Sequence, residues 1–313
     1  MISGIMAGIL WGLDTVVLGI LLTTTGFVSS SQAIALAPFI STFLHDACSS
    51  LWMLLYMAAR RQLGKVVKAA KTKSGKFIIL GALLGGPLGM SGYVFSISLI
   101  GPAYSAVISS MFPAVGALLS YLFLKEKMTL VQLSGLGVSI FGVIMLGYTP
   151  SSSVIGEGFL LGIGCAFLSV IGWAGEAVIC AYGMRDPDVS DEQALQIRQV
   201  TSTLFYAIVL LPLLSGWSTT VVAASSVQSY PVIFAALLGT ASYVLYYRSI
   251  NQIGASKAMA LNITYTAWAI LFAVILLGTM PDLRTIFFGL LVVLGSLVAA
   301  NGISMFLPQK TVI

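Results

Sequence analysis

The chain has 313 residues, of which 58% are hydrophobic and 8% are charged, and its formal net charge is +5. Soluble domains carry about 25% charged residues, so this composition excludes an ordinary globular protein. The positive charge does not indicate nucleic-acid binding, because seven of the fifteen Lys and Arg residues lie within residues 60–76, as in a cytoplasmic loop of a membrane protein.

Ten apolar segments follow one another along the chain, each close to or above the roughly 20 residues that a bilayer-spanning helix needs. They are predicted at residues 2–24, 32–59, 77–100, 102–124, 129–148, 154–183, 190–214, 229–250, 254–279 and 283–307. The loops between them leave no room for a soluble domain. The sequence therefore predicts an all-α membrane protein with ten transmembrane helices.

The distribution of basic residues predicts how these segments are oriented. Apart from Arg284, the basic residues of the loops follow even-numbered segments: residues 60–76, Lys125, Lys127, Arg185 and Arg248. Such a bias marks cytoplasmic loops, so both termini are expected on the cytoplasmic side of a bacterial-type inner membrane. The first apolar run has no basic n-region and exceeds twenty residues, which favours a first span over a cleaved signal peptide.

An internal repeat divides the chain into two halves, residues 1–150 and residues 151–313, within one membrane domain. The sequence from Gly101 can be laid on the sequence from Gly254 without a gap, at an offset of 153 residues. Each half then has five segments, and an odd number inverts the second half relative to the first. Inverted repeats are a transporter architecture, with the substrate near the midplane at the repeat interface.

A tryptophan and an acid recur three residues apart in both halves. Trp173 precedes Glu176 in the sixth segment, and Trp11 precedes Asp14 in the first. Residues at i and i+3 share a helix face, and a carboxylate at bilayer depth costs about 2.5–3.5 kcal/mol, which makes it a functional candidate. An indole face attracts a cation, with quaternary ammonium ligands as the usual functional case. The two pairs predict a site for an organic cation, although Asp14 could instead face water in a vestibule.

A second set of ionisable residues lies in the second and seventh segments. His45 and Asp46 correspond in the repeat to Arg198 and Gln199. An acid and an arginine in corresponding helices can pair and so offset the cost of burying either alone. A structural ion pair or polar gate is favoured over direct ligand contact, and these residues are candidates for gating or coupling, as is Asn262.

Further aromatic residues lie near the predicted midplane. Tyr265 and Trp268 share a face of the ninth segment, and Tyr243 lies deep in the eighth. Tyr246 and Tyr247 precede Arg248, where an interfacial aromatic belt explains them equally well. The third segment is interrupted at Gly85-Gly86-Pro87 and the fourth at Pro113, and Met90 after the first break is a candidate for lining the same cavity.

Signatures of enzymes are absent from the sequence. A single histidine excludes a multi-histidine metal site, and there is neither a G-x-S-x-G elbow nor a G-x-x-x-x-G-K-[ST] loop for a nucleotide. Cys48, Cys165 and Cys180 all lie in apolar segments and form no C-x-x-C, so they predict neither a disulfide nor a metal site. No cofactor is expected.

The chain resembles the drug/metabolite transporter superfamily of the EamA type, through its ten segments in two halves, its glycine-rich first span and the end of the fourth span. It is similar more narrowly to LicB-type choline permeases. The stretches that carry this similarity are Leu10-Trp11-Gly12, His45-Asp46, residues 81–90, Trp173-Ala174-Gly175-Glu176, residues 197–202 and residues 261–268. The resemblance implies that Trp11, Trp173, Glu176, Tyr265 and Trp268 belong to the substrate pocket. Asp14 departs from the pattern, in which a small residue is expected.

Three functions are compatible with these patterns. The favoured one is a secondary carrier that imports choline or a related quaternary ammonium cation by alternating access, driven at least partly by the membrane potential. The alternative is an EamA-type exporter of amino acids or other small metabolites, for which Arg198 is the residue that could bind a carboxylate. The third is a non-transporting membrane protein, which would not need charges at that depth. The expected partners are a small organic cation and the lipid bilayer, with no nucleic acid and no nucleotide.

Overall fold

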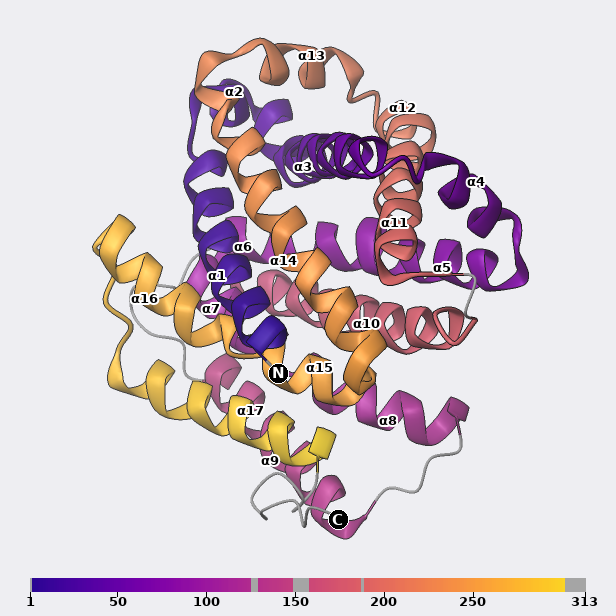
Figure 1. The fold of residues 1–313 in the computed structure, drawn as a ribbon. Helices are drawn as coiled ribbons and strands as arrows, with labels where there is room; N and C mark the ends of the chain where they lie inside the picture. Colours follow the sequence, from indigo (N-terminus) through magenta and orange to yellow (C-terminus); the bar gives the residue numbers. More distant parts are fainter. Residues whose placement is uncertain (1, 125–128, 149–157, 187–188, 302–313) are drawn as a thin grey trace.

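The computed structural model describes residues 2–124, 129–148, 158–186 and 189–301, and all regular secondary structure in these ranges is helical (Figure 1). Lys125, Lys127 and the predicted boundary at residues 150 and 151 lie outside the described residues. The helices of the first half are α1 (Ile2–Leu22), α2 (Thr25–Val28), α3 (Ser31–Ala59), α4 (Leu63–Lys71), α5 (Lys73–Leu83), the π-helix η1 (Leu84–Met90), α6 (Ser91–Ile100), α7 (Pro102–Ser109), α8 (Phe112–Leu124) and α9 (Leu130–Tyr148).

The helices of the second half are α10 (Phe159–Gly183), α11 (Asp191–Phe205), the π-helix η2 (Tyr206–Leu210), α12 (Leu211–Leu213), α13 (Trp217–Ser225), the 3₁₀-helix η3 (Val227–Ser229), α14 (Pro231–Ile253), α15 (Ala255–Asn262), α16 (Tyr265–Leu277) and α17 (Leu283–Asn301). Nine described helical segments are long and apolar enough to cross a membrane, and α9 adds a shorter apolar stretch at Leu130–Leu146. The predicted all-α membrane fold is confirmed.

The packing of the helices repeats between the halves. Helix α1 packs on α14 and on α15–α16, and its counterpart α10 packs on α5–η1–α6 and on α7–α8. Helix α3 packs on α11, and α9 packs on α17, so that the second and fifth spans of each half contact their own counterparts. Figure 1 shows α1 beside α14 and α17 beside α9. The first span of each half is thus enclosed by the third and fourth spans of the other kind of repeat unit that it meets.

The fourth and ninth spans are broken at corresponding residues. α7 follows Gly101 and α15 follows Gly254, and both glycines have positive φ, +79° and +84°. Such φ values are costly for residues with a Cβ, which explains glycine at both positions. α7 ends at Ser109 and α15 at Asn262, which preserves the offset of 153 residues, and the chain then turns into α8 and α16. The repeat inferred from the sequence therefore extends to the backbone conformation.

Glycines on one face of α1 allow a close approach to the broken ninth span. A Cβ on Gly4 would come 2.7 Å from Leu261 Cβ, and one on Gly12 would come 2.7 Å from Trp268 Cβ. Spacing of four residues places such glycines on one face, where a neighbouring backbone can approach. This contact brings the break between α15 and α16 to the level of Trp11.

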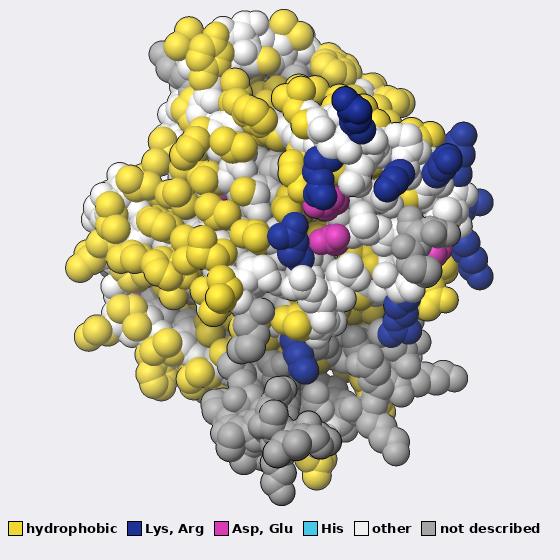
Figure 2. Space-filling view, viewed as in Figure 1, with side chains coloured by type: hydrophobic (Ala, Val, Ile, Leu, Met, Phe, Trp, Pro, Cys, Tyr) yellow, Lys and Arg dark blue, Asp and Glu magenta, His cyan; other side chains and the backbone are white. Residues whose placement is uncertain are grey.

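Charged and apolar side chains occupy different parts of the surface. In Figure 2 hydrophobic side chains cover the face over α1, α16 and α17, whereas Lys and Arg side chains gather towards α4, α5 and α11. At this basic end Arg60 pairs with Glu192, and Arg248 lies 3.7 Å from Glu192 and 3.8 Å from Asp191. Ion pairs thus join the ends of α3, α11 and α14 on one side of the molecule.

Candidate functional site

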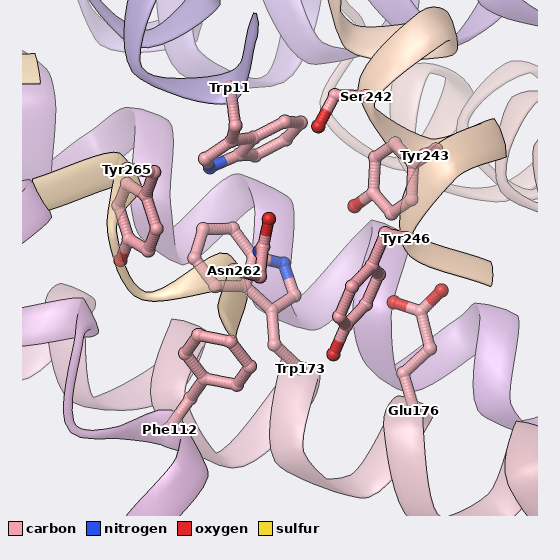
Figure 3. A pocket seen from close by; sticks show the side chains of 9 residues that line it. All are labelled: Trp11, Phe112, Trp173, Glu176, Ser242, Tyr243, Tyr246, Asn262 and Tyr265. Atoms are coloured by element: carbon pink, nitrogen blue, oxygen red, sulfur yellow. The ribbon is translucent and has the colours of Figure 1, made fainter. Parts of the chain in front are cut away.

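A pocket lies where α1, α8, α10, α14 and the end of α15 meet (Figure 3). Its lining residues are Trp11, Phe112, Trp173, Glu176, Ser242, Tyr243, Tyr246, Asn262 and Tyr265. Trp11 and Phe112 come from the first half and the others from the second. The pocket therefore lies at the seam between the two halves, and its wall is mainly aromatic.

The aromatic rings of the pocket contact one another edge to face. The ring of Trp11 lies 5.7 Å from that of Trp173 and 5.2 Å from that of Tyr243, with interplanar angles of 82° and 79°. Phe112 packs against Trp173 at 6.2 Å and 85°. Such contacts are worth about 0.5–1.5 kcal/mol beyond burial, so they hold the rings in fixed orientations. The two tryptophans that the repeat aligns thus meet across the seam.

Glycines of the interrupted third span make room for the residues of α10. A Cβ on Gly89 would lie 2.9 Å from Trp173 Cδ1, and one on Gly85 would overlap the carboxylate of Glu176. On α10 itself, a Cβ on Gly172 would lie 2.6 Å from Gly89 Cα. The predicted interruption is present as the π-helix η1, which stays packed against α10 rather than opening into the pocket.

Glu176 lies at the edge of the pocket with its carboxylate already engaged. Its side chain is 4% exposed, and Oε1 accepts hydrogen bonds from Arg198 Nε at 3.1 Å and from the Tyr247 hydroxyl at 2.6 Å. The predicted role as a counter-charge is therefore shared with an internal cation.

Arg198 is the centre of a buried polar network. Besides Glu176, it donates to Asp46 Oδ1 at 3.3 Å, to the side chain of Gln199 at 2.7 Å and to the Tyr243 hydroxyl at 3.0 Å. Its guanidinium carbon also lies 4.6 Å from the centre of the Tyr243 ring. The pairing predicted between the second and seventh spans is confirmed, and Arg198 is fully buried outside the pocket wall.

Asp14 belongs to this network and does not line the pocket. Its Oδ1 lies 3.3 Å from His45 Nε2, while His45 Nδ1 lies 3.5 Å from Asp46 Oδ1. A Cβ on Gly239 would come 2.7 Å from His45 Nε2 and 3.2 Å from Asp14 Oδ2, so α14 leaves room for the pair. The prediction of a second acid beside Trp11 in the cation site is not supported, because one turn beyond Trp11 the face of α1 meets α3 and α14.

Two other predicted lining residues also lie elsewhere. Met90 is 1% exposed and packs in the core behind the pocket. The Trp268 ring stacks on Phe272 at 6.2 Å, with its Cβ against Gly12, and it is not part of the wall. Asn262, expected as a gating residue, lines the pocket.

Three lining residues were not predicted from the sequence: Phe112, Ser242 and Tyr246. Tyr246 was explained equally well by an interfacial belt, yet its hydroxyl is buried. The spacing i, i+3 from Tyr243 to Tyr246 was a usable signal, since it places both rings on one helix face. Phe112 begins α8 directly after the break of the fourth span, a position that Pro113 could have indicated.

The buried charges do not balance. Asp14, Asp46 and Glu176 carry three carboxylates, against the guanidinium of Arg198 and at most one positive charge on His45. At their ordinary charges these groups leave at least one negative charge in excess. Within the part of the chain that the structure describes, no group of three or more His, Cys, Asp or Glu side chains is arranged to hold a metal ion.

Comparisons with known proteins agree on a membrane transporter. The model of the EamA-like transporter family matches residues 1–148 and 160–301. Protein LicB of Haemophilus influenzae is 34% identical over 275 residues, which cover 85% of each chain. A solved crystal structure superposes with a TM-score of 0.61 at 17% identity and covers 98% of both chains, which shows a shared fold.

Proposed function

Since the chain belongs to the EamA-like transporter family, we propose that it is a secondary transporter that imports choline or a related quaternary ammonium cation. Alternating access between the two halves, driven at least partly by the membrane potential, would carry the cation inwards. The observation that carries this proposal is the pocket at the seam, where aromatic rings from both halves surround a space bordered by Glu176.

The chemistry of the wall suits a cation without N–H groups. A quaternary ammonium ion donates no hydrogen bond, so its desolvation must be offset by ring faces and a nearby negative charge. A cation over an indole face gains about 2 kcal/mol or more when desolvated. Trp11, Trp173 and Tyr265 supply such rings, whereas Tyr243 already holds the guanidinium of Arg198.

The excess of buried carboxylates supports a monovalent cation as the ligand. With one substrate charge added, the formal charge of the set moves towards neutrality. Glu176 is the charged residue among the nine that line the pocket, and it links the pocket to Arg198 and Asp46. Substrate charge would therefore be balanced by the network as a whole.

The membrane potential is sufficient to concentrate such a cation. Entry of one positive charge gains about 2.3 kcal/mol per 100 mV of inside-negative potential. This corresponds to roughly fortyfold accumulation, at tenfold per 1.4 kcal/mol. The gathering of basic residues at one end of the molecule favours a cytoplasmic location for that end, and with it the predicted inner-membrane orientation.

Export of zwitterionic metabolites is the alternative, and the state of Arg198 weighs against it. A zwitterion needs a cationic or helix N-terminal partner for its carboxylate. Arg198, the residue predicted for this role, is fully buried and donates to Glu176, Asp46, Gln199 and Tyr243. It would have to leave these partners to reach a substrate.

Uptake of radiolabelled choline into proteoliposomes tests the proposal. We expect accumulation that rises with an imposed inside-negative potential and is reduced by other quaternary ammonium ions. Uptake that is indifferent to the potential would contradict electrogenic entry. Competition by amino acids, without competition by quaternary ammonium ions, would favour the exporter.

A matched pair of tryptophan variants ties the uptake to the pocket. Trp173→Leu removes a pocket ring, and we expect choline affinity to fall by at least about tenfold, from the loss of about 2 kcal/mol. Trp217→Leu removes a ring that is 42% exposed and packs on Phe43, so uptake should stay near the wild-type value. Equal effects of the two variants would remove the pocket from its assigned role.

A further inference from the structure

Among the polar atoms that line the pocket, most already have partners within the protein. The Tyr265 hydroxyl bonds with Ser109 Oγ at 2.6 Å, and Ser242 donates to the carbonyl of Ala7 at 2.8 Å. Glu176 and Tyr243 are bonded to Arg198. These groups need nothing from a ligand to be satisfied.

Three buried polar atoms of the wall have no hydrogen-bond partner in the described structure: Trp173 Nε1, Tyr246 OH and Asn262 Oδ1. A buried polar group left unpaired is costly, and most such groups in native proteins are paired. Trp173 Nε1 lies beside Gly89, 3.1 Å from the point that a Cβ would occupy. Tyr246 and Asn262 instead project from α14 and α15, on two different sides of the pocket (Figure 3).

A quaternary ammonium head cannot satisfy these two atoms, because it neither donates nor accepts a hydrogen bond. They therefore require a second group on the ligand. Asn262 Oδ1 accepts and the Tyr246 hydroxyl can both donate and accept, so together they match an alcohol, which donates one hydrogen bond and accepts another. A carboxylate offers no donor to Asn262 and would lie near Glu176, and an ester offers no donor either.

We propose that Tyr246 and Asn262 form a hydroxyl subsite, which makes them specificity-determining residues for a quaternary ammonium alcohol. The inference rests on the proposed function, because the subsite acts on the other end of a ligand whose head lies among the rings. It adds that the pocket distinguishes choline from cations with the same head and no hydroxyl group. A site built to hydrogen-bond a ligand hydroxyl rejects analogues that lack it, because its own polar groups stay buried and unpaired.

The test compares choline with ethyltrimethylammonium, which has the same head and lacks the hydroxyl group. In competition against radiolabelled choline uptake by the full chain, we expect ethyltrimethylammonium to be at least about tenfold weaker than unlabelled choline. Glycine betaine and acetylcholine should be weaker as well. Equal competition by choline and ethyltrimethylammonium would overturn the subsite and leave the proposed function standing.

Two variants locate the discrimination. Tyr246→Phe keeps the ring and removes the hydroxyl, and Asn262→Leu removes the amide at similar volume. Each should lower the affinity for choline while leaving that for ethyltrimethylammonium within about threefold of wild type, so that their ratio approaches one. This ratio is insensitive to the amount of folded protein, which separates recognition from a loss of stability.

Tyr121→Phe and Asn251→Leu are the matched controls, since both residues are exposed and lie outside the pocket wall. They should keep the wild-type ratio. A tenfold ratio that persists in both Tyr246→Phe and Asn262→Leu would overturn the assignment. If the chain carries no quaternary ammonium ion at all, the subsite and the proposed function fall together.

Discussion

Two motifs with the same spacing have different surroundings in this protein. Trp173 and Glu176 both line the pocket, whereas Trp11 lines it and Asp14 lies beside His45. At Glu176 the neighbouring strip of η1 carries Gly85, which leaves space for a carboxylate next to the pocket. At Asp14 it is Gly239 of α14 that leaves the space, and His45 of α3 fills it.

The difference shows what an i, i+3 spacing determines. It places two side chains on one face of a helix, but that face is about one turn long at this distance and can meet two different neighbours. Trp11 meets Trp173 and Tyr243, and Asp14 meets His45. One acid therefore borders the ligand space, and the other serves the charge balance of the network behind it.

Exchange of each acid for its amide should give the largest contrast. Glu176→Gln removes the charge at the pocket, and we expect choline affinity to fall by roughly 30-fold, for a loss of about 2 kcal/mol. Asp14→Asn should change affinity by less than about threefold. The measurement is the concentration dependence of choline uptake in proteoliposomes. Similar losses in both variants would mean that Asp14 also faces the ligand.

Alanine at the two accommodating glycines should sharpen the contrast at an intermediate level. Gly85→Ala and Gly239→Ala each insert a methyl group into occupied space, which typically costs about 1–3 kcal/mol. Both should lower the melting temperature of the purified protein, but Gly85→Ala should also weaken choline binding, because it displaces Glu176. Thermal unfolding in detergent and binding are measured on the same samples.

Gly137→Ala is the control for these variants, because no atom lies within 4 Å of the position of its Cβ. It should leave stability unchanged or raise it slightly, since alanine is favoured over glycine within a helix. A loss of choline affinity in Gly239→Ala equal to that in Gly85→Ala would contradict the separation of the two acids.

The smallest expected effect concerns the tryptophans of the seam. Trp11→Phe keeps an aromatic ring in the pocket but exchanges indole for a weaker cation–π partner, so choline affinity should fall by about fivefold, or about 1 kcal/mol. Trp268→Phe alters a ring that stacks on Phe272 outside the wall, and uptake should be unchanged. A greater loss in Trp268→Phe would place that ring next to the ligand.

Much of the architecture follows from the sequence. Hydrophobicity over spans of roughly 20 residues determines membrane helices, because every backbone polar group in lipid must be paired within its own segment. The repeat at an offset of 153 residues predicted the corresponding breaks, since Gly101 and Gly254 adopt the same unusual backbone conformation. The pairing of Asp46 with Arg198 followed from their corresponding positions and the cost of burying a lone charge.

The sequence by itself thus determined the helices, their repeat and the residues that had to find a polar partner. Which partner each one found was decided by tertiary structure: Asp14 and Trp268 turned to neighbours outside the pocket, and Tyr246 turned into it. The physical reason is that helical spacing is a local property, whereas the neighbour of a helix face depends on how other helices cross it. Small residues such as Gly85, Gly89 and Gly239 set those crossings, and their effect becomes visible only where two helices meet.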